Sequence, residues 1–149
     1  LVGSEMCIRD RYCQDKMNYK LGQNLIEWSF KIKQECLIVW SEVLDDPNPI
    51  HLNKNKVKDL GLGDNCINQG PANVAYIINC ISKNFHKFEL VSIKNKFRGN
   101  VFSGDTVTVT GLISSINNCD ETIFLTLNLY LNTQNKKGVV ETTAVIKIP

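Results

Sequence analysis

The sequence predicts an α+β fold in which an antiparallel sheet wraps around one long buried helix. The first observation behind this prediction is a largely apolar segment with helical spacing near the middle of the chain, from Gly70 to Lys83. The second is a switch to period-two alternation after Lys83, which continues to the end of the chain. The chain has 149 residues, 43% of them hydrophobic, which suits a single domain with one core.

The first predicted element is a strand over residues 24–32, because apolar and polar residues alternate there. One face of this strand is apolar and carries Ile26, Trp28, Phe30 and Ile32. A short helix is expected over residues 33–43, where apolar residues recur at helical spacing. A second short helix, rich in Lys and Asn, is expected over residues 53–60. Between the two helices, Pro47 and Pro49 exclude a regular helix.

The long apolar helix is expected to begin at Gly70, since Pro71 suits the first helical turn. Its apolar residues cover more than one face, as expected for a helix that is buried over most of its girth. The small side chains of Ala72 and Ala75 would let a sheet approach closely. Trp28, Trp40 and Tyr76 occupy apolar positions and are expected in the core.

Four long strands are expected after the helix, separated by turns that contain Gly or Asn. They cover residues 88–97, 105–116, 122–132 and 139–148. A sheet of this kind around a single buried helix is the hotdog arrangement.

Composition and charge exclude several classes of protein. Seventeen Lys and Arg against fifteen Asp and Glu give a net charge of +2, too small a bias to indicate a nucleic-acid partner. No apolar run approaches the roughly 20 residues that a membrane span needs. The six cysteines are scattered and form no CxxC pair, which favours reduced thiols in a cytoplasmic protein and argues against a metal site.

Residues 1–16 are expected to be a non-native or disordered tail. They begin LVGSEMCIRDRY, which resembles translated sequencing-adapter sequence and lacks the apolar core of a signal peptide. We therefore expect a single domain over residues 17–149, with the natural chain beginning near Met17.

The most informative motif is the hexapeptide DPNPIH at residues 46–51. In a helix, Asp46 and His51 would lie about 140° apart around the axis, and in a strand they would lie roughly 17 Å apart. The two prolines instead predict a compact bend in which the carboxylate and the imidazole converge. The amide of Asn48 would then be available to orient water or to stabilise the bend.

A carboxylate and an imidazole in this arrangement are suited to adding water to a polarised double bond, or to removing it. One group takes a proton from water and the other delivers a proton to carbon. The enolate that forms needs hydrogen-bond donors aimed at its oxygen, and the start of a helix offers free backbone amides. Gly70 is the candidate donor, because without a Cβ it lets a thioester carbonyl approach its N–H closely.

With these elements in place, the chain resembles the MaoC-like family of (R)-specific enoyl-CoA hydratases and dehydratases. That family is characterised by D-x-N-P-[LIV]-H, then I-x-H-G at the start of the helix, then a strand with F-x-x-x-V-x-x-G-D. The corresponding segments here are DPNPIH at 46–51, INQG at 67–70 and FRGNVFSGD at 97–105. The resemblance covers about residues 20–149.

The resemblance implies that Asp46 and His51 are the catalytic pair, with Asn48 in support and the Gly70 amide as oxyanion donor. It also implies a homodimer that binds an acyl-CoA thioester, in which CoA is part of the substrate, and no metal or other cofactor. Gln69 stands where the family has His, so it can still form hydrogen bonds to substrate but cannot carry a proton, which bears on substrate preference.

Arg98 lies in the strand motif, and a run of cationic residues next to the hexapeptide contains Lys54, Lys56 and Lys58. These side chains either contact the phosphates of CoA or belong to a solvated face of the protein.

Three functions remain open from the sequence. The first is a lyase that hydrates trans-2-enoyl-CoA to (R)-3-hydroxyacyl-CoA or catalyses the reverse dehydration. The second is a hotdog subunit that binds an acyl thioester without turnover and pairs with an active partner. The third is a thioesterase, which is disfavoured because no Asp or Glu lies between Gln69 and Ser82, where hotdog thioesterases usually carry their carboxylate.

Overall fold

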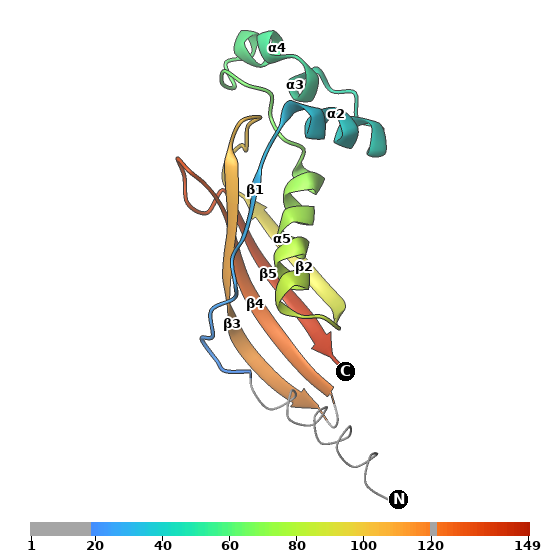
Figure 1. Ribbon diagram of the computed structural model, residues 1–149, viewed down its shortest axis with the longest axis vertical. Coiled ribbons are helices and arrows are strands. Elements are labelled where there is room, and N and C mark those ends of the chain that lie inside the picture. Colours follow the sequence, from blue (N-terminus) through green and yellow to red (C-terminus); the bar gives the residue numbers. More distant parts are fainter. Residues whose placement is uncertain (1–18, 120–121) are drawn as a thin grey trace, which may run out of the picture.

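A five-stranded antiparallel sheet curves around one long helix in the computed structural model, which describes residues 19–119 and 122–149 (Figure 1). The strand order across the sheet is β1-β3-β4-β5-β2, so β1 and β2 form its two edges. The strands are β1 (Trp28–Lys31), β2 (Glu89–Phe97), β3 (Thr106–Cys119), β4 (Thr122–Thr133) and β5 (Val140–Ile148). The α+β prediction is confirmed, and the four strands after the helix begin and end within three residues of their predicted bounds.

Three short helices gather at one end of the molecule, above the N-terminus of the long helix (Figure 1). They are α2 (Gln34–Val43), α3 (Pro49–Leu52) and α4 (Lys54–Asp59), and the long helix is α5 (Gly70–Asn84). The sequence predicted α2 and α4 but not α3, a single turn that begins at the second proline of the hexapeptide. This end of the molecule contains the whole of DPNPIH.

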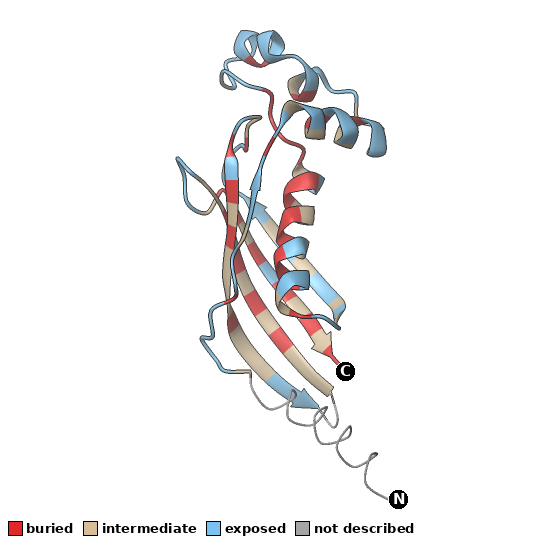
Figure 2. Ribbon diagram, viewed as in Figure 1, coloured by how far each residue is buried: buried red, intermediate tan, exposed pale blue. Residues whose placement is uncertain are grey.

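The core lies between α5 and the concave face of the sheet, and Figure 2 shows the buried residues along α5 and the strands. Ala72, Ile77 and Cys80 of α5 are fully buried, as are Leu127 and Ala144 of the sheet. Tyr76 is buried and stacks on Trp28 with ring centroids 5.5 Å apart, and Trp40 is partly buried against the same core. Tyr76 therefore lies in the core as expected, and Trp28 and Trp40 pack against the core while only partly buried.

The first predicted strand is shorter than expected, and its alternation breaks. Trp28 pairs with Val109, but Asn24 pairs with Leu112, so the β1 side holds one extra residue between these two pairs. An extra residue of this kind reverses which side chains face inward. Leu25 is consequently buried and Ile26 is 63% exposed, the opposite of the predicted pattern.

The four cysteines that the structure describes are free thiols, as the sequence predicted. Cys66 and Cys80 are buried, Cys36 is partly buried and Cys119 is exposed. The two remaining cysteines, and the whole tail at residues 1–16, lie outside the described residues. Within the described ranges, no helix is both long enough and apolar enough to cross a membrane.

Candidate active site

The DPNPIH segment folds into a tight bend followed by the single turn of α3. Asp45 adopts a φ of 50°, which reverses the chain after α2 and is better tolerated by Asp than by most residues. Asn48 caps α3, because its side-chain oxygen accepts a hydrogen bond from the N–H of Ile50 at 3.2 Å. Pro49 occupies the first helical position, where its missing N–H costs nothing. The bend that the prolines predicted is therefore present, and Asn48 stabilises it.

This bend brings the two ends of the hexapeptide together. His51 Nε2 lies 3.3 Å from Asp46 Oδ2. The imidazole is 9% exposed, whereas the carboxylate is 45% exposed. The other carboxylate oxygen of Asp46 accepts a hydrogen bond from the N–H of Asn48 at 3.4 Å. The pair thus combines a carboxylate that reaches solvent with an imidazole fixed beneath it.

Hydrogen bonds on both sides hold the pair in place. His51 Nδ1 lies 2.6 Å from the carbonyl oxygen of Ile67, and because a carbonyl only accepts, Nδ1 carries the proton. Nε2, the nitrogen without a proton in the neutral ring, therefore faces Asp46. On the other side, the hydroxyl of Ser41 donates to the Asp46 carbonyl at 2.5 Å, and Gln34 donates to the His51 carbonyl at 2.9 Å.

A hydrogen bond links this pair to the start of α5, because the Ile67 carbonyl that bonds His51 is only three residues before Gly70. The helix has no side-chain cap, in contrast to α3 and α4, which Asn48 and Asn53 cap. Pro71 has no N–H, so the N–H groups of the first turn belong to Gly70 and Ala72, and such groups have no partner within the helix itself. An uncapped helix start is a site for an oxyanion.

Gln69 does not cap the helix, because its side chain points to α2. Its amide Nε2 donates to the carbonyl oxygen of Leu37 at 2.9 Å, and the residue is 1% exposed. Nearby, Asn68 donates to the side-chain oxygen of Asn73 at 2.8 Å, and both residues are buried. Burial raises the pKa of the Tyr76 hydroxyl, while the Asn68 side chain opposes the rise. The Gln69 hydrogen bond thus joins α2 to the residue that precedes α5.

Arg98 forms an ion pair within the chain. Its Nε and Nη2 atoms both lie 3.1 Å from Oε2 of Glu141, on the neighbouring strand β5. Lys136 donates to the carbonyl oxygen of Arg98 at 2.7 Å. The guanidinium therefore already has a carboxylate partner, and the structure does not bring it together with Asp46 and His51 through any hydrogen bond.

An apolar cavity of about 510 Å³ opens beside Gly70. It is lined by Gly70, Pro71, Val74, Ala75, Ile78 and Phe97. The helix face that forms its floor is only partly buried in the single chain. An apolar ligand group in this cavity would contact Gly70.

Sequence reasoning missed the groups that hold the site, namely Gln34, Ser41, Asn68 and Asn73. Ser41 and Gln34 lie in α2, whose sequence has an ordinary amphipathic pattern, so no local signal distinguishes these two residues. The pair Asn68 and Asn73 offered a signal, since two Asn residues beside an otherwise apolar helix start are expected to pair if buried. Among the described residues, no group of three or more His, Cys, Asp or Glu side chains is placed to bind a metal ion.

No family model matches the sequence, and no curated protein matches it significantly. Solved structures do match the fold. The (R)-hydratase from A. caviae involved in PHA biosynthesis has a TM-score of 0.81 at 19% identity, over 89% of this chain and 99% of that one. A MaoC-like dehydratase from Rhodospirillum rubrum gives 0.79 at 13% identity, over 88% and 93%. The ChsH1–ChsH2 complex from Mycobacterium tuberculosis gives 0.77 at 14% identity, over 87% and 98%.

These likenesses define the fold class. The chain has the hotdog fold, with a sheet wrapped around α5 and a helical end that contains the Asp-His pair. The chain shares this fold with an (R)-hydratase and with a MaoC-like dehydratase, as the motifs of the sequence predicted.

Proposed function

We propose that this protein is a hydro-lyase of the MaoC-like family that adds water to trans-2-enoyl-CoA thioesters, giving (R)-3-hydroxyacyl-CoA, or removes it in reverse. The observation that carries the proposal is the 3.3 Å contact between Asp46 and His51, whose imidazole is hydrogen-bonded to Ile67 just before the uncapped start of α5. The fold likeness to hydratases and dehydratases supports the same reaction class.

In the proposed reaction, the Asp46 carboxylate takes a proton from water as the water oxygen bonds to the β-carbon of the enoyl group. The electron pair of the double bond moves toward the thioester oxygen, where the N–H of Gly70 stabilises the enolate. His51 then passes the proton held by Asp46 through Nε2 to the α-carbon, so that both side chains return to their starting states as the enolate collapses to the thioester. Every step transfers a proton or forms a carbon–oxygen bond, so the reaction needs no metal or redox cofactor.

The acyl chain is proposed to occupy the apolar cavity beside Gly70. Because this cavity of about 510 Å³ begins at the proposed oxyanion donor, a thioester carbonyl at Gly70 would direct the acyl group along Val74 and Ile78. Asn48 supports the reaction indirectly by fixing the bend, and Gln69 by holding α2 against α5. We therefore assign both residues positioning roles.

A homodimer is proposed as the active form. Strand β2 is an unpaired edge of the sheet, and an edge of this length is a template for pairing with a second chain. Val91 and Phe97 of β2 are 49% and 51% exposed, and Phe97 lines the apolar cavity. Pairing of two β2 edges would cover these residues and close the cavity. The free thiols and the CoA substrate suit a cytoplasmic enzyme.

A second candidate is a thioester-binding subunit that becomes active only with a different hotdog chain. The fold likeness to a chain of the two-component ChsH1–ChsH2 complex favours this candidate, as does the replacement of the family His by Gln69. The intact Asp46–His51 pair favours the enzyme. No acidic residue is present on α5, which argues against a thioesterase on this scaffold.

The deciding experiment follows the loss of enoyl-thioester absorbance when the purified chain is mixed with crotonyl-CoA and with a longer enoyl-CoA. Turnover by the chain alone would support the hydro-lyase. Absence of turnover that is restored by a co-purified second hotdog chain would instead support the subunit hypothesis. Hydrolysis to free CoA, detected with a thiol reagent, would contradict both.

A further inference from the structure

The neutral imidazole of His51 has one ring proton and two neighbouring oxygen atoms that can accept it. Nδ1 lies 2.6 Å from the carbonyl oxygen of Ile67, and Nε2 lies 3.3 Å from Asp46 Oδ2. A charge-assisted hydrogen bond from an N–H to a carboxylate is about 2.7–2.9 Å long, so the shorter contact with Ile67 holds the proton on Nδ1. The position of one backbone carbonyl therefore decides which tautomer His51 adopts.

The tautomer of His51 matters for the proposed reaction. In that reaction Nε2 takes the proton held by Asp46 and passes it to the α-carbon, so Nε2 must be free of a proton beforehand. If the ring proton moved to Nε2, this nitrogen would donate to Asp46 and could not accept from it. Turnover thus requires the Ile67 carbonyl to stay where it accepts from Nδ1.

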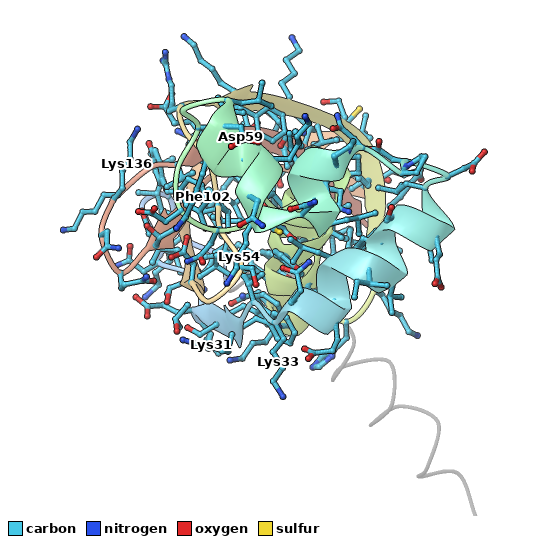
Figure 3. The ribbon with its side chains drawn as sticks, turned by 90° about the horizontal axis from the view of Figure 1, so that it is seen from above. Lys31, Lys33, Lys54, Asp59, Phe102 and Lys136 are labelled. Carbon is cyan, nitrogen blue, oxygen red and sulfur yellow. The ribbon has the colours of Figure 1, made fainter. Side chains whose placement is uncertain are left out.

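Backbone hydrogen bonds hold one side of the segment that carries this carbonyl. Ile67 forms an isolated antiparallel bridge with Phe102, and the N–H of Asn68 donates to the carbonyl oxygen of Val101 at 2.7 Å. Figure 3 looks onto the helical end of the molecule and shows Phe102 there. These bonds tie residues 67–68 to the chain that leads into β3, but they do not tie them to α5.

On the helix side, Asn73 of α5 binds two consecutive residues of the segment. Its N–H donates to the carbonyl oxygen of Gln69 at 3.2 Å, and its side-chain oxygen accepts from Asn68 Nδ2 at 2.8 Å. The side chains of Asn68 and Asn73 are both buried. Asn68 Oδ1 has no hydrogen-bond partner within the described part of the chain, so the bond to Asn73 is the one that orients this side chain.

We propose that Asn73 is a positioning residue that acts through Asn68 to hold the Ile67 carbonyl, and thereby keeps the ring proton of His51 on Nδ1. No hydrogen bond of the described structure joins Asn73 directly to His51, so its effect passes through the two residues between them. The expected effect on turnover rests on the proposed function, whereas the tautomer can be measured without any substrate.

The first measurement is the tautomer itself. The chain contains two histidines, and the second, His86, is exposed. Long-range 1H–15N correlation spectra at about pH 8.5, where an ordinary histidine is neutral, show which nitrogen of each ring carries the proton. His86→Gln assigns the signals, and His86 is the internal reference for an exposed ring. We expect the proton on Nδ1 of His51 in the wild type, and a shift of part of it to Nε2 in Asn73→Leu.

The second measurement is steady-state hydration of crotonyl-CoA. Asn73→Leu removes the acceptor at similar volume, and we expect kcat to fall about 10-fold with KM nearly unchanged. Asn73→Asp keeps an acceptor oxygen for Asn68 and is expected to retain most of kcat. Asn84→Leu is the matched control, because Asn84 ends the same helix and its side chain donates to the carbonyls of Ile26 and Cys80. It should lower stability without changing kcat or the tautomer.

A proton shift to Nε2 with a lower kcat in Asn73→Leu, and neither change in Asn84→Leu, supports the proposal. An unchanged tautomer in Asn73→Leu overturns it, whatever happens to kcat. Equal changes in the two variants also overturn it, since they would reflect a general loosening of α5. If Asn73→Leu does not fold, Asn68→Ala breaks the same hydrogen bond and is judged by the same criteria.

The two measurements separate this inference from the proposed function. If the wild type hydrates no enoyl thioester, the proposed function fails, and the spectra alone then decide the positioning role of Asn73. If the wild type is active and a shifted tautomer leaves kcat unchanged, the link between Asn73 and catalysis is overturned while the proposed function stands.

Discussion

The Asp46 carboxylate and the His51 imidazole lie 3.3 Å apart although one is nearly half exposed and the other is almost fully buried. This asymmetry suits their proposed roles. The exposed carboxylate reaches water, which it must deprotonate, while the imidazole is held by the Ile67 carbonyl with its second nitrogen toward the site. A rigid imidazole beside an accessible carboxylate is favourable for taking a proton from water at one carbon and delivering a proton to its neighbour.

Replacing either member of the pair is expected to abolish most hydration. Asp46→Asn removes the base and His51→Gln removes the second proton carrier, so each should lower kcat/KM by about 100-fold to 10,000-fold. The measurement is the initial rate of enoyl absorbance loss. Asp45→Asn is the matched control, because Asp45 is the exposed neighbouring acid and should retain near-wild-type activity. Wild-type rates in Asp46→Asn, with unchanged circular dichroism, would rule out the assigned base.

The hydroxyl of Ser41 is expected to position Asp46. It is buried and donates to the Asp46 carbonyl at 2.5 Å, so Ser41→Ala leaves that carbonyl without this donor. We expect a loss of about 1 kcal/mol in the free energy of unfolding and a severalfold fall in kcat with KM nearly unchanged. Urea unfolding and steady-state kinetics check the two effects. Ser82→Ala, at an exposed position of α5, is the control and should change neither.

The sequence predicted the fold well where one periodicity dominates. The apolar helix from Gly70 and the four strands after it follow directly from side-chain spacing, and their bounds agree closely with the structure. The sequence was less informative at β1. There, one extra residue between Asn24 and Trp28 reverses the alternation, and nothing in the local pattern marks its position.

The candidate site was predictable only in part, for a related reason. Asp46, Asn48 and His51 are recognisable because the prolines between them restrict the backbone. The side chains that hold them come from α2 and from the segment before α5, and such contacts depend on how helices pack. Gln69 illustrates the limit, since its position suggested a group facing substrate and the structure directs its amide to the Leu37 carbonyl.

Gly70→Ala is expected to separate catalysis from stability. A Cβ at this position would meet the ring of Phe97 at 3.6 Å, an ordinary van der Waals contact, so the fold should accept it. The methyl group would nevertheless stand beside the N–H that the thioester oxygen must approach. We expect a fall in kcat of about 10-fold to 100-fold with an unchanged urea midpoint. Unchanged kcat would remove Gly70 from the oxyanion site.

A charge on the β2 edge is expected to weaken the proposed dimer. Val91 is 49% exposed on this edge, and two Val91→Lys chains would bring like charges together. Sedimentation equilibrium should show a shift from dimer to monomer, with activity falling in parallel. Ile26→Lys is the matched control, because Ile26 is 63% exposed just before the opposite edge strand β1. Equal sedimentation of both variants and wild type would place the interface elsewhere.

The stability of the fold is expected to decrease above pH 9 because of one buried thiol. Burial raises the pKa of Cys80 from 9.0 to about 11. Between these values the unfolded chain loses the thiol proton and the folded chain keeps it, so unfolding is favoured as pH rises. The stabilisation is complete below pH 9 and is lost progressively as pH approaches about 11.

The expected loss from this group between pH 8 and pH 10 is about 1 kcal/mol in the free energy of unfolding. Urea unfolding with a reducing agent measures it, and Cys80→Ala serves as the comparison because alanine does not titrate. The variant should be less stable at pH 8, since Cys80 is fully buried, but its stability should fall less steeply with pH. Equal slopes for both proteins would show that the Cys80 thiol ionises as readily in the folded chain as in the unfolded one.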